Sequence, residues 1–272
     1  MTALTAIVIA ALCLALAMTA AWRVAVATGQ SGWIDAIWTF SVGAAAVFLA
    51  LVPLADATAY WPRQLLVAGL AAAWSLRLGL HIVSRTRRGT DDPRYAQLRK
   101  DWGAAWRARL LMFLQIQAAC ALLLAVSGMA AARNPYPELL WTDFLGAAIV
   151  LAAIAGEGLA DRQLARFASE PSNKGKVCDA GLWSWSRHPN YFFEWLGWLA
   201  YPVIALDLSG GYWWGAAALM APALMYWLLV HASGIPPLEA HMLRSRGDAY
   251  RAYQARVNAF WPAPPGHRGE TA

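Results

Sequence analysis

Long apolar runs separated by short polar segments dominate the pattern of this chain. A helix that crosses the hydrocarbon core of a bilayer needs about 20 mostly apolar residues, and five of the runs reach that length. Two later runs are shorter and contain Pro202 and Pro222, so they predict either two tilted helices or one helix and a re-entrant segment. The pattern predicts an all-α, polytopic integral membrane protein with about seven transmembrane helices. The predicted spans are Ala3–Ala25, Trp33–Ala55, Leu65–Val83, Leu110–Ala131, Leu140–Ala160, Trp195–Leu208 and Trp213–Val230.

Composition agrees with this interpretation, since 59% of the 272 residues are hydrophobic and 14% are charged. No internal repeat or long linker divides the chain, so we expect a single transmembrane domain over residues 1–272. Within it, residues 1–31 would form the first helix, residues 33–262 the core and residues 263–272 a flexible tail. The run Ala3–Ala25 is too long for a signal peptide and no basic segment precedes it, which favours a membrane helix.

The basic residues predict the orientation. Of the 22 Lys and Arg residues, 17 lie in Arg85–Arg107, Arg162–Arg187 and Arg244–Arg268, whereas Asn134–Glu138 and Asp207–Tyr212 contain none. By the positive-inside rule the three basic segments are cytoplasmic, with the N-terminus outside and the C-terminus inside. The net charge of +6 then needs no nucleic acid partner, and the oligomeric state is left open.

Cysteine and histidine do not form a metal-ligand pattern. The three cysteines have no disulfide or metal spacing, and the five histidines lack the i, i+4 pairing of helical zinc sites. We therefore predict no metal.

Polar residues inside the predicted spans indicate an intramembrane chamber, because charge at bilayer depth is costly and tends to face a partner or a cavity. Asp35 opens the second span, and Arg77 and His81 stand four residues apart on the third. Gln115 and Gln117 lie in the fourth span, and Glu157 lies near the cytoplasmic end of the fifth. Each of these groups also has a structural interpretation as a bridge between helices.

The segment Lys174–Glu194 concentrates hydrogen-bonding groups at the mouth of an apolar helix. Arginine and lysine suit a phosphate, and the helix start favours an anion. Asn190 and Glu194 share one helical face, so an amide and a carboxylate lie together, as the carboxamide or ribose of a nucleotide would require. The alternative is a cytoplasmic boundary with an interfacial belt of tryptophans.

A second polar segment, Glu239–Pro262, carries a carboxylate, two tyrosines and several arginines, and residues Leu238–Tyr253 are predicted to form an amphipathic helix. If it folds back under the bundle, it would close a cytoplasmic cofactor crevice against Lys174–Glu194. The alternative is a basic helix lying on anionic lipid.

The motifs RHPNYFFEW and ExxxxxxxGxxYxxYxxRVxxFxP resemble the superfamily of the steroid 5-alpha-reductase C-terminal domain. That superfamily includes the sterol delta-14 reductases and the isoprenylcysteine carboxyl methyltransferases. The segment Trp74–Tyr95 resembles its bacterial branch of membrane proteins, which implies a bacterial inner membrane as the location. The resemblance covers roughly Asp35 to Pro262. It implies a pocket for NADPH. The residues that the resemblance places in this pocket are Lys176, Trp183, Arg187, His188, Asn190, Tyr191, Glu194, Glu239 and Tyr253.

The resemblance predicts an NADPH-dependent reductase of a carbon–carbon double bond in a lipid-like substrate such as a steroid, sterol or polyprenoid. Steroid 5-alpha-reductases carry a Gln-Glu pair on an early helix, which is missing before Arg77, so Asp35, Arg77 or His81 are the candidates for assisting protonation. The related methyltransferases bind S-adenosylmethionine through a similar element, usually with a small residue soon after the tyrosine, where Phe192 and Phe193 stand here. A membrane methyltransferase and a non-enzymatic lipid-binding protein are the alternatives.

Overall fold

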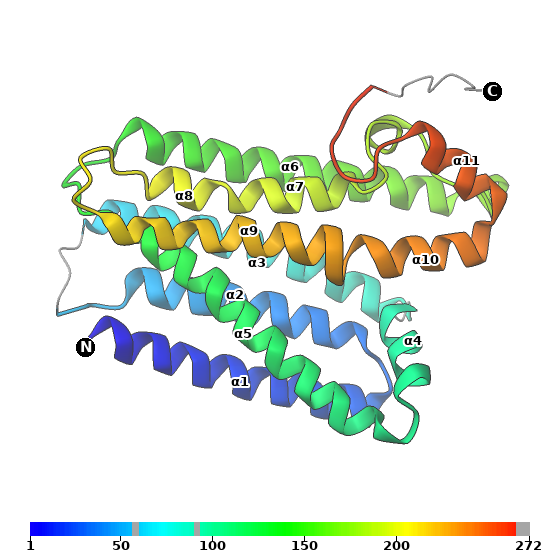
Figure 1. Ribbon diagram of the computed structural model, residues 1–272, viewed down its shortest axis with the longest axis horizontal. Helices are drawn as coiled ribbons and strands as arrows, with labels where there is room; N and C mark the ends of the chain where they lie inside the picture. Colours follow the sequence, from blue (N-terminus) through cyan, green and yellow to red (C-terminus); the bar gives the residue numbers. More distant parts are fainter. Residues whose placement is uncertain (56–59, 90–92, 265–272) are drawn as a thin grey trace. The chain divides into compact units, whose positions relative to one another are not determined.

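The computed structural model describes residues 1–55, 60–89 and 93–264, and over these ranges its regular secondary structure is helical, with no strand (Figure 1). The predicted all-α class is therefore confirmed. Most of the predicted tail, residues 265–272, lies outside the described residues. The α-helices are α1 (Ala3–Thr28), α2 (Gly32–Leu51), α3 (Trp61–Arg87), α4 (Pro93–Trp102), α5 (Trp106–Ala132), α6 (Trp141–Ser169), α7 (Pro189–Trp198), α8 (Ala200–Ile204), α9 (Met220–Trp227), α10 (Ile235–Arg246) and α11 (Asp248–Arg256). Shorter turns of other helix types are η1 (Gly103–Ala105), η2 (Pro171–Asn173), η3 (Gly181–Ser184), η4 (Trp213–Leu219) and the π-helical η5 (Leu228–Ala232).

Six helical stretches of the described chain are long and apolar enough to cross a bilayer, as expected of a multi-pass membrane protein. They are Ala3–Thr28, Gly32–Leu51, Trp61–Arg87, Arg94–Ala132, Trp141–Ser169 and Trp213–Arg246.

The predicted span Trp195–Leu208 is not one continuous helix. Helix α7 ends at Trp198 and α8 begins at Ala200. Pro202 explains the break, because its ring nitrogen has no hydrogen to donate to the carbonyl of Trp198, four residues earlier. Where about seven spans were predicted, the described chain has six long apolar stretches and one interrupted segment, α7 with α8.

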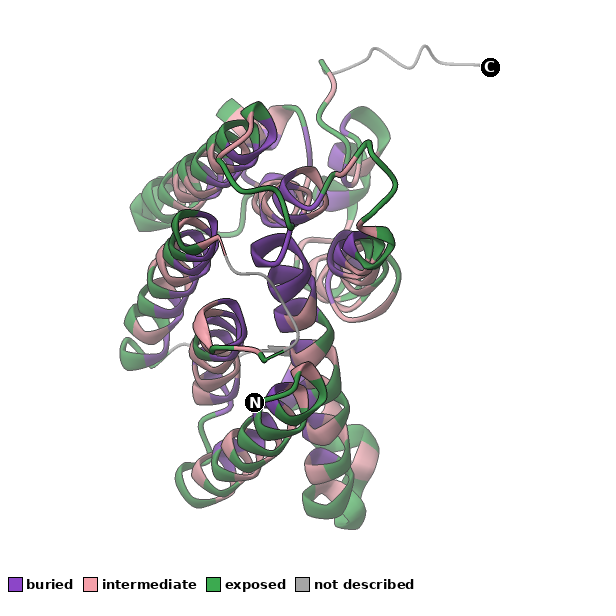
Figure 2. Ribbon diagram, turned by 90° about the vertical axis from the view of Figure 1, so that its left-hand side faces the viewer, coloured by how far each residue is buried: buried purple, intermediate pink, exposed green. Residues whose placement is uncertain are grey.

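The helices form two compact units, which we describe separately. Unit 1 contains Met1–Ala148 and Leu199–Ala221, and unit 2 contains Ile149–Trp198 and the chain from Pro222 onward. In each unit the helices carry buried residues on one side and exposed residues on another (Figure 2).

In unit 1, α2 packs most extensively against α3, and α5 runs obliquely across α1 and α2 (Figure 1). Small residues allow the close approach of α2 and α3. A β-carbon at Gly43 would collide with the side chain of Ser75, and one at Gly79 would lie 2.5 Å from the ring of Phe40. Close packing through small residues is the usual way for membrane helices to associate.

One end of unit 1 is held by a fully buried ion pair. Arg63 Nε lies 2.8 Å from Asp143 Oδ1, and both side chains have no exposed surface. The same guanidinium donates to the carbonyl oxygens of Asn134 and Tyr136, at 2.9 and 2.7 Å, and to that of Glu138. Asp143 also accepts a hydrogen bond from the backbone N–H of Leu140, 2.8 Å away. The pair thereby ties α3 to the connection between α5 and α6.

In unit 2, α6 and α7 also meet through small residues. A β-carbon at Gly156 would collide with the Phe193 ring, and one at Gly197 would lie 3.3 Å from the β-carbon of Ala153. Further along, α10 and α11 are separated by Gly247, whose φ of +53° suits glycine. The prediction of a helical segment over Leu238–Tyr253 is confirmed, with this turn inside it.

Candidate functional site

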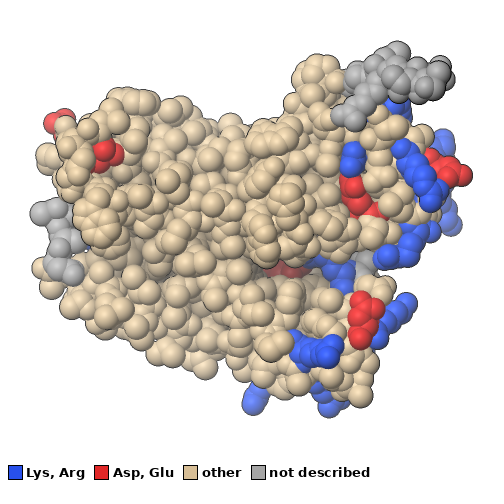
Figure 3. Space-filling model, viewed as in Figure 1, with Lys and Arg blue, Asp and Glu red and all other residues tan. Residues whose placement is uncertain are grey.

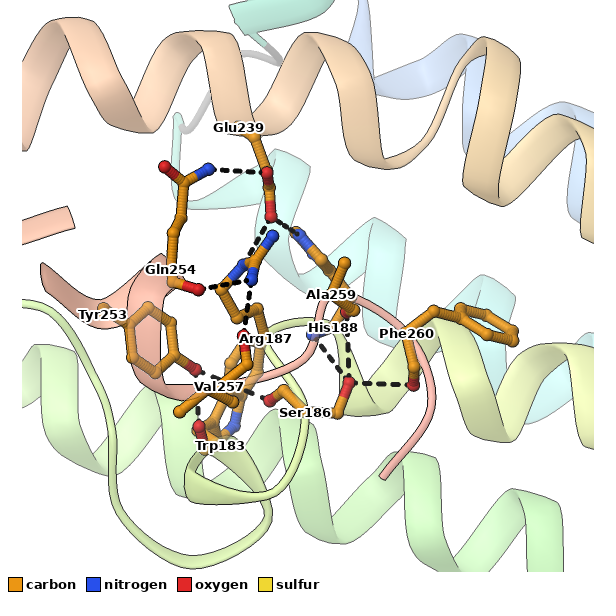
Figure 4. Close-up of polar contacts among 10 residues, drawn as sticks. All are labelled: Trp183, Ser186, Arg187, His188, Glu239, Tyr253, Gln254, Val257, Ala259 and Phe260. Atoms are coloured by element: carbon orange, nitrogen blue, oxygen red, sulfur yellow. Dashed lines mark hydrogen bonds and ion pairs between the residues drawn. The ribbon is translucent and has the colours of Figure 1, made fainter. Parts of the chain in front are cut away.

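The candidate site lies in unit 2, where the start of α7 meets α10 and α11 (Figure 4). Its centre is an ion pair between Arg187 and Glu239, with Nε and Oε1 2.7 Å apart. The NH1 group of Arg187 also donates to the carbonyl oxygens of Gln254, at 3.3 Å, and Val257. Only about a tenth of each charged side chain is exposed, at 10% and 14%. The predicted pairing of the two polar segments in space is therefore observed.

His188 is the second partner of Glu239. Its Nε2 lies 3.1 Å from Glu239 Oε1, and its ring stacks on that of Tyr191, with centroids 5.5 Å apart and planes inclined by 13°. Burial lowers the pKa of His188, and it outweighs the opposite effect of the nearby carboxylate. The neutral imidazole then donates its Nε2–H to Glu239.

Local sequence explains how Arg187 and His188 are presented. Pro189 occupies the first position of α7, where its fixed φ suits a helix start and its missing N–H is not needed. The backbone N–H of His188 donates to Ser186 Oγ at 3.1 Å. Arg187 and His188 therefore lie in a hydrogen-bonded turn immediately before α7.

The C-terminal segment closes over this turn. The backbone N–H of Arg187 donates to the carbonyl of Asn258 at 2.8 Å, and that of Ala263 donates to the carbonyl of Trp185 at 3.0 Å. Ser186 Oγ bonds to the carbonyls of Ala259 and Phe260, at 3.2 and 3.0 Å. Residues 257–263, which we call the C-terminal strap, are therefore part of the site.

Tyr253 and Trp183 form the base of the site rather than an open surface. The Tyr253 hydroxyl donates to the carbonyl of Trp183, and Trp183 Nε1 donates to the carbonyl of Ala160 at 3.0 Å. Both side chains are buried, and burial raises the pKa of Tyr253. Tyr253 also packs with Tyr250 and Val257 in a small buried core.

Asn190 and Glu194 lie on α7, as predicted, but their environments differ. Glu194 is buried and accepts a hydrogen bond from Trp198 Nε1 at 2.9 Å. Asn190 is half-buried, and its side chain makes no hydrogen bond among the described residues. Its amide is therefore available to a ligand.

Two cationic groups lie at the edge of the site. Arg187 bonds through Nε and NH1 inside the protein, Tyr250 is a further hydrogen-bonding neighbour of its side chain, and 10% of that side chain is exposed. Lys176 is exposed, and its backbone carbonyl accepts from Arg246 Nε at 3.3 Å. A guanidinium nitrogen, an ammonium and an amide are the donors that phosphate and carboxamide groups require.

A separate polar cluster lies in unit 1, around Asp35 of α2. Asp35 Oδ2 lies 2.6 Å from Arg94 NH2, and Oδ1 accepts from the Tyr95 hydroxyl at 2.9 Å. Gln117 of α5 donates to the same hydroxyl at 3.4 Å. The cluster thus joins α2, α4 and α5.

The remaining sequence candidates in unit 1, Arg77 and His81, are half-buried on α3. Sequence reasoning missed Arg94 and Tyr95, although both end the Trp74–Tyr95 segment on which part of the resemblance rests. Among the residues that the structure describes, no three His, Cys, Asp or Glu side chains gather closely enough to hold a metal ion.

A family model described as "Protein of unknown function (DUF1295)" matches residues 21–257, which include both polar clusters. The chain belongs to the DUF1295 family. In this DUF1295 protein the matched range ends at Val257, whose carbonyl accepts the hydrogen bond from Arg187. No curated protein and no solved structure matches the chain.

Proposed function

We propose that this DUF1295 protein is an integral-membrane, NADPH-dependent reductase of a carbon–carbon double bond in a lipid-like substrate. The observation that carries the proposal is the arrangement around Glu239. The carboxylate holds Arg187 and His188 in place, while Asn190 and Lys176 keep donors for a ligand. The resemblance of RHPNYFFEW to the steroid 5-alpha-reductase superfamily supports the choice of NADPH.

In this proposal each donor binds a different part of the dinucleotide. Lys176 and the exposed part of the Arg187 guanidinium would bind phosphate oxygens, and Asn190 would bind a carboxamide or a ribose hydroxyl. Tyr191, with its ring against His188, offers an aromatic face beside them. Glu239, Trp183 and Tyr253 would act by positioning, since their polar atoms already bond within the protein.

The charge pattern supports a cytoplasmic site. The segments Arg162–Arg187 and Arg244–Arg268 are rich in basic residues, and the proposed cofactor residues lie in or beside them. We therefore place the site on the cytoplasmic side, where NADPH is available, with the N-terminus outside and the C-terminus in the cytoplasm.

Reduction of a double bond needs two additions. NADPH, when bound, supplies a hydride equivalent to the electron-poor carbon. The other carbon takes a proton, for which Asp35, Arg77 and His81 are the candidates, with Tyr95 and Arg94 as hydrogen-bonding partners of Asp35. A substrate that partitions into the bilayer suits groups carried by membrane helices.

Ligand stabilisation of the purified protein tests the proposal. NADPH at a hundred times its Kd should stabilise the fold by about 2.7 kcal/mol, visible as a rise in Tm. Asn190→Ala should weaken this rise in Tm, and so should Lys176→Gln. Lys174→Gln is the matched control, because both lysines are exposed and lie two residues apart. It should leave the rise unchanged, since Lys174 is not among the proposed cofactor residues.

The alternatives give different outcomes in the same assay. A rise in Tm with S-adenosylmethionine and none with NADPH would indicate a methyltransferase. A response to neither compound would favour a lipid-binding protein.

A further inference from the structure

We propose a second binding site, on unit 1, for an anionic phospholipid of the surrounding bilayer. The site lies where α4 turns through η1 into α5, and it is independent of the reductase proposal. Its cationic part consists of four exposed basic side chains, which we call the basic corner. They are Arg99, Lys100, Arg107 and Arg109.

The basic corner is unbalanced in charge. Residues 99–109 contain these four basic side chains and one acidic side chain, Asp101. Asp101 forms no ion pair among the described residues and accepts a hydrogen bond from Gln97 at 2.8 Å. In unit 1, Lys and Arg gather around α4, while the helix bodies are covered by neutral residues (Figure 3). A local excess of positive charge attracts anionic lipid headgroups.

The corner is held by contacts on its inner side. Tyr95 of α4 is buried, bonds to Asp35 and meets the edge of the Phe113 ring, with centroids 6.5 Å apart. Trp102 follows Tyr95 by seven residues and lies on the same side of the helix. Lys100, five residues after Tyr95, lies on another side of the helix and faces outward, whereas Arg99, four residues after Tyr95, lies nearer the anchored side and is exposed at its edge.

Tryptophans indicate that the corner lies at the membrane–water interface. Trp102 and Trp106 are in contact, with ring centroids 5.9 Å apart, and the Arg99 guanidinium lies over the Trp106 ring at 5.8 Å. Trp22 Nε1 of α1 donates to the carbonyl of Arg107 at 2.9 Å. Tryptophan is enriched where headgroups meet the hydrocarbon, so phosphates reach this level.

The surface of α5 beyond the corner fits an acyl chain. Met112 and Ile116 follow Arg109 by three and seven residues, so all three share one face of the helix. Met112 is 63% exposed and Ile116 is 56% exposed. Ile116 lies roughly 10 Å along the axis from Arg109, which is about two-thirds of one hydrocarbon leaflet. A cation at the interface followed by an apolar strip matches the two parts of a phospholipid.

Lipid selectivity in nanodiscs tests the site. The protein is placed in nanodiscs of equimolar phosphatidylcholine and phosphatidylglycerol, and the lipids that stay bound after release are identified by native mass spectrometry. We expect phosphatidylglycerol to be retained preferentially. The variant in which all four residues of the basic corner become Gln should lose the preference, and Arg99→Gln alone should reduce it roughly fivefold.

The matched control removes four cations elsewhere. Gln replaces Arg244, Arg246, Arg251 and Arg256, and this variant should keep the preference of the wild type. An equal loss in the control would show an effect of net charge and overturn the site, as would equal retention of both lipids by the wild type. The Tm of each single Gln variant of the basic corner is also measured in nanodiscs of phosphatidylcholine alone. An unchanged Tm excludes misfolding as the cause of a lost preference for phosphatidylglycerol.

Discussion

Glu239 Oε1 lies 2.7 Å from Arg187 Nε, so a carboxylate of α10 holds the arginine that precedes α7. Gln254 Nε2 donates to the other carboxylate oxygen at 2.8 Å. Glu239 is thus bonded on both oxygens, and the residues at the start of α7 depend on one side chain from a distant part of the sequence.

Replacing Glu239 by Ala should destabilise the protein by about 3 kcal/mol, because it leaves a largely buried guanidinium without its counter-charge. Denaturant unfolding in detergent measures the change. The matched control is Asp248→Ala, which removes the partner of Arg251 in a pair whose side chains are 67% and 97% exposed. That exposed pair should contribute below about 1 kcal/mol. Equal losses in the two variants would contradict the assigned role.

Stability should fall as the pH drops below about 6.5. The pKa of His188 is lowered in the folded protein from an ordinary value of 6.5, so below that value the unfolded chain binds the proton first. The stability contributed by the neutral imidazole is therefore present above pH 6.5 and is lost toward the lowered pKa. Tm measured from pH 8 to pH 5 should decline less in His188→Gln, and identical curves would exclude His188 as the titrating group.

Replacing Arg63 by Ala should be among the most damaging single changes in unit 1. It leaves Asp143 buried without its partner and three carbonyl oxygens without their donor, so we expect a loss of roughly 3–5 kcal/mol. Arg63→Met combined with Asp143→Leu should recover part of the loss, since no lone buried charge remains. Unfolding curves of the single and double variants compare these effects. A double variant no more stable than the Arg63→Ala protein would argue against an electrostatic cause.

Gly156→Ala should destabilise unit 2 by about 1–3 kcal/mol, because the added methyl group meets the ring of Phe193. Gly69→Ala is the matched control. Nothing lies within 4 Å of a β-carbon at Gly69, and alanine favours the helix, so its stability should be unchanged or higher. Thermal unfolding of the two variants provides the comparison.

The apolar runs predicted the helices well, because length and hydropathy alone decide whether a segment can cross a bilayer. They left open whether the segment around Pro202 is one helix, and they did not predict the long final stretch Trp213–Arg246, because a proline can either bend a helix or end it. The site was partly accessible from sequence, since Glu239 and Arg187 carry opposite charges in segments expected to meet. Tyr95 was not, because its contact with Asp35 joins residues 60 positions apart.

The C-terminal strap has a consequence for biosynthesis. Arg187, Ser186 and Trp185 bond to residues 258–263, and Ser186 and Ala259 are 73 positions apart in the chain. During synthesis the start of α7 is therefore made well before the strap. Its donors and acceptors stay unpaired until residues 258–263 have been added, and a chain that stops before residue 258 lacks the segment that completes the site.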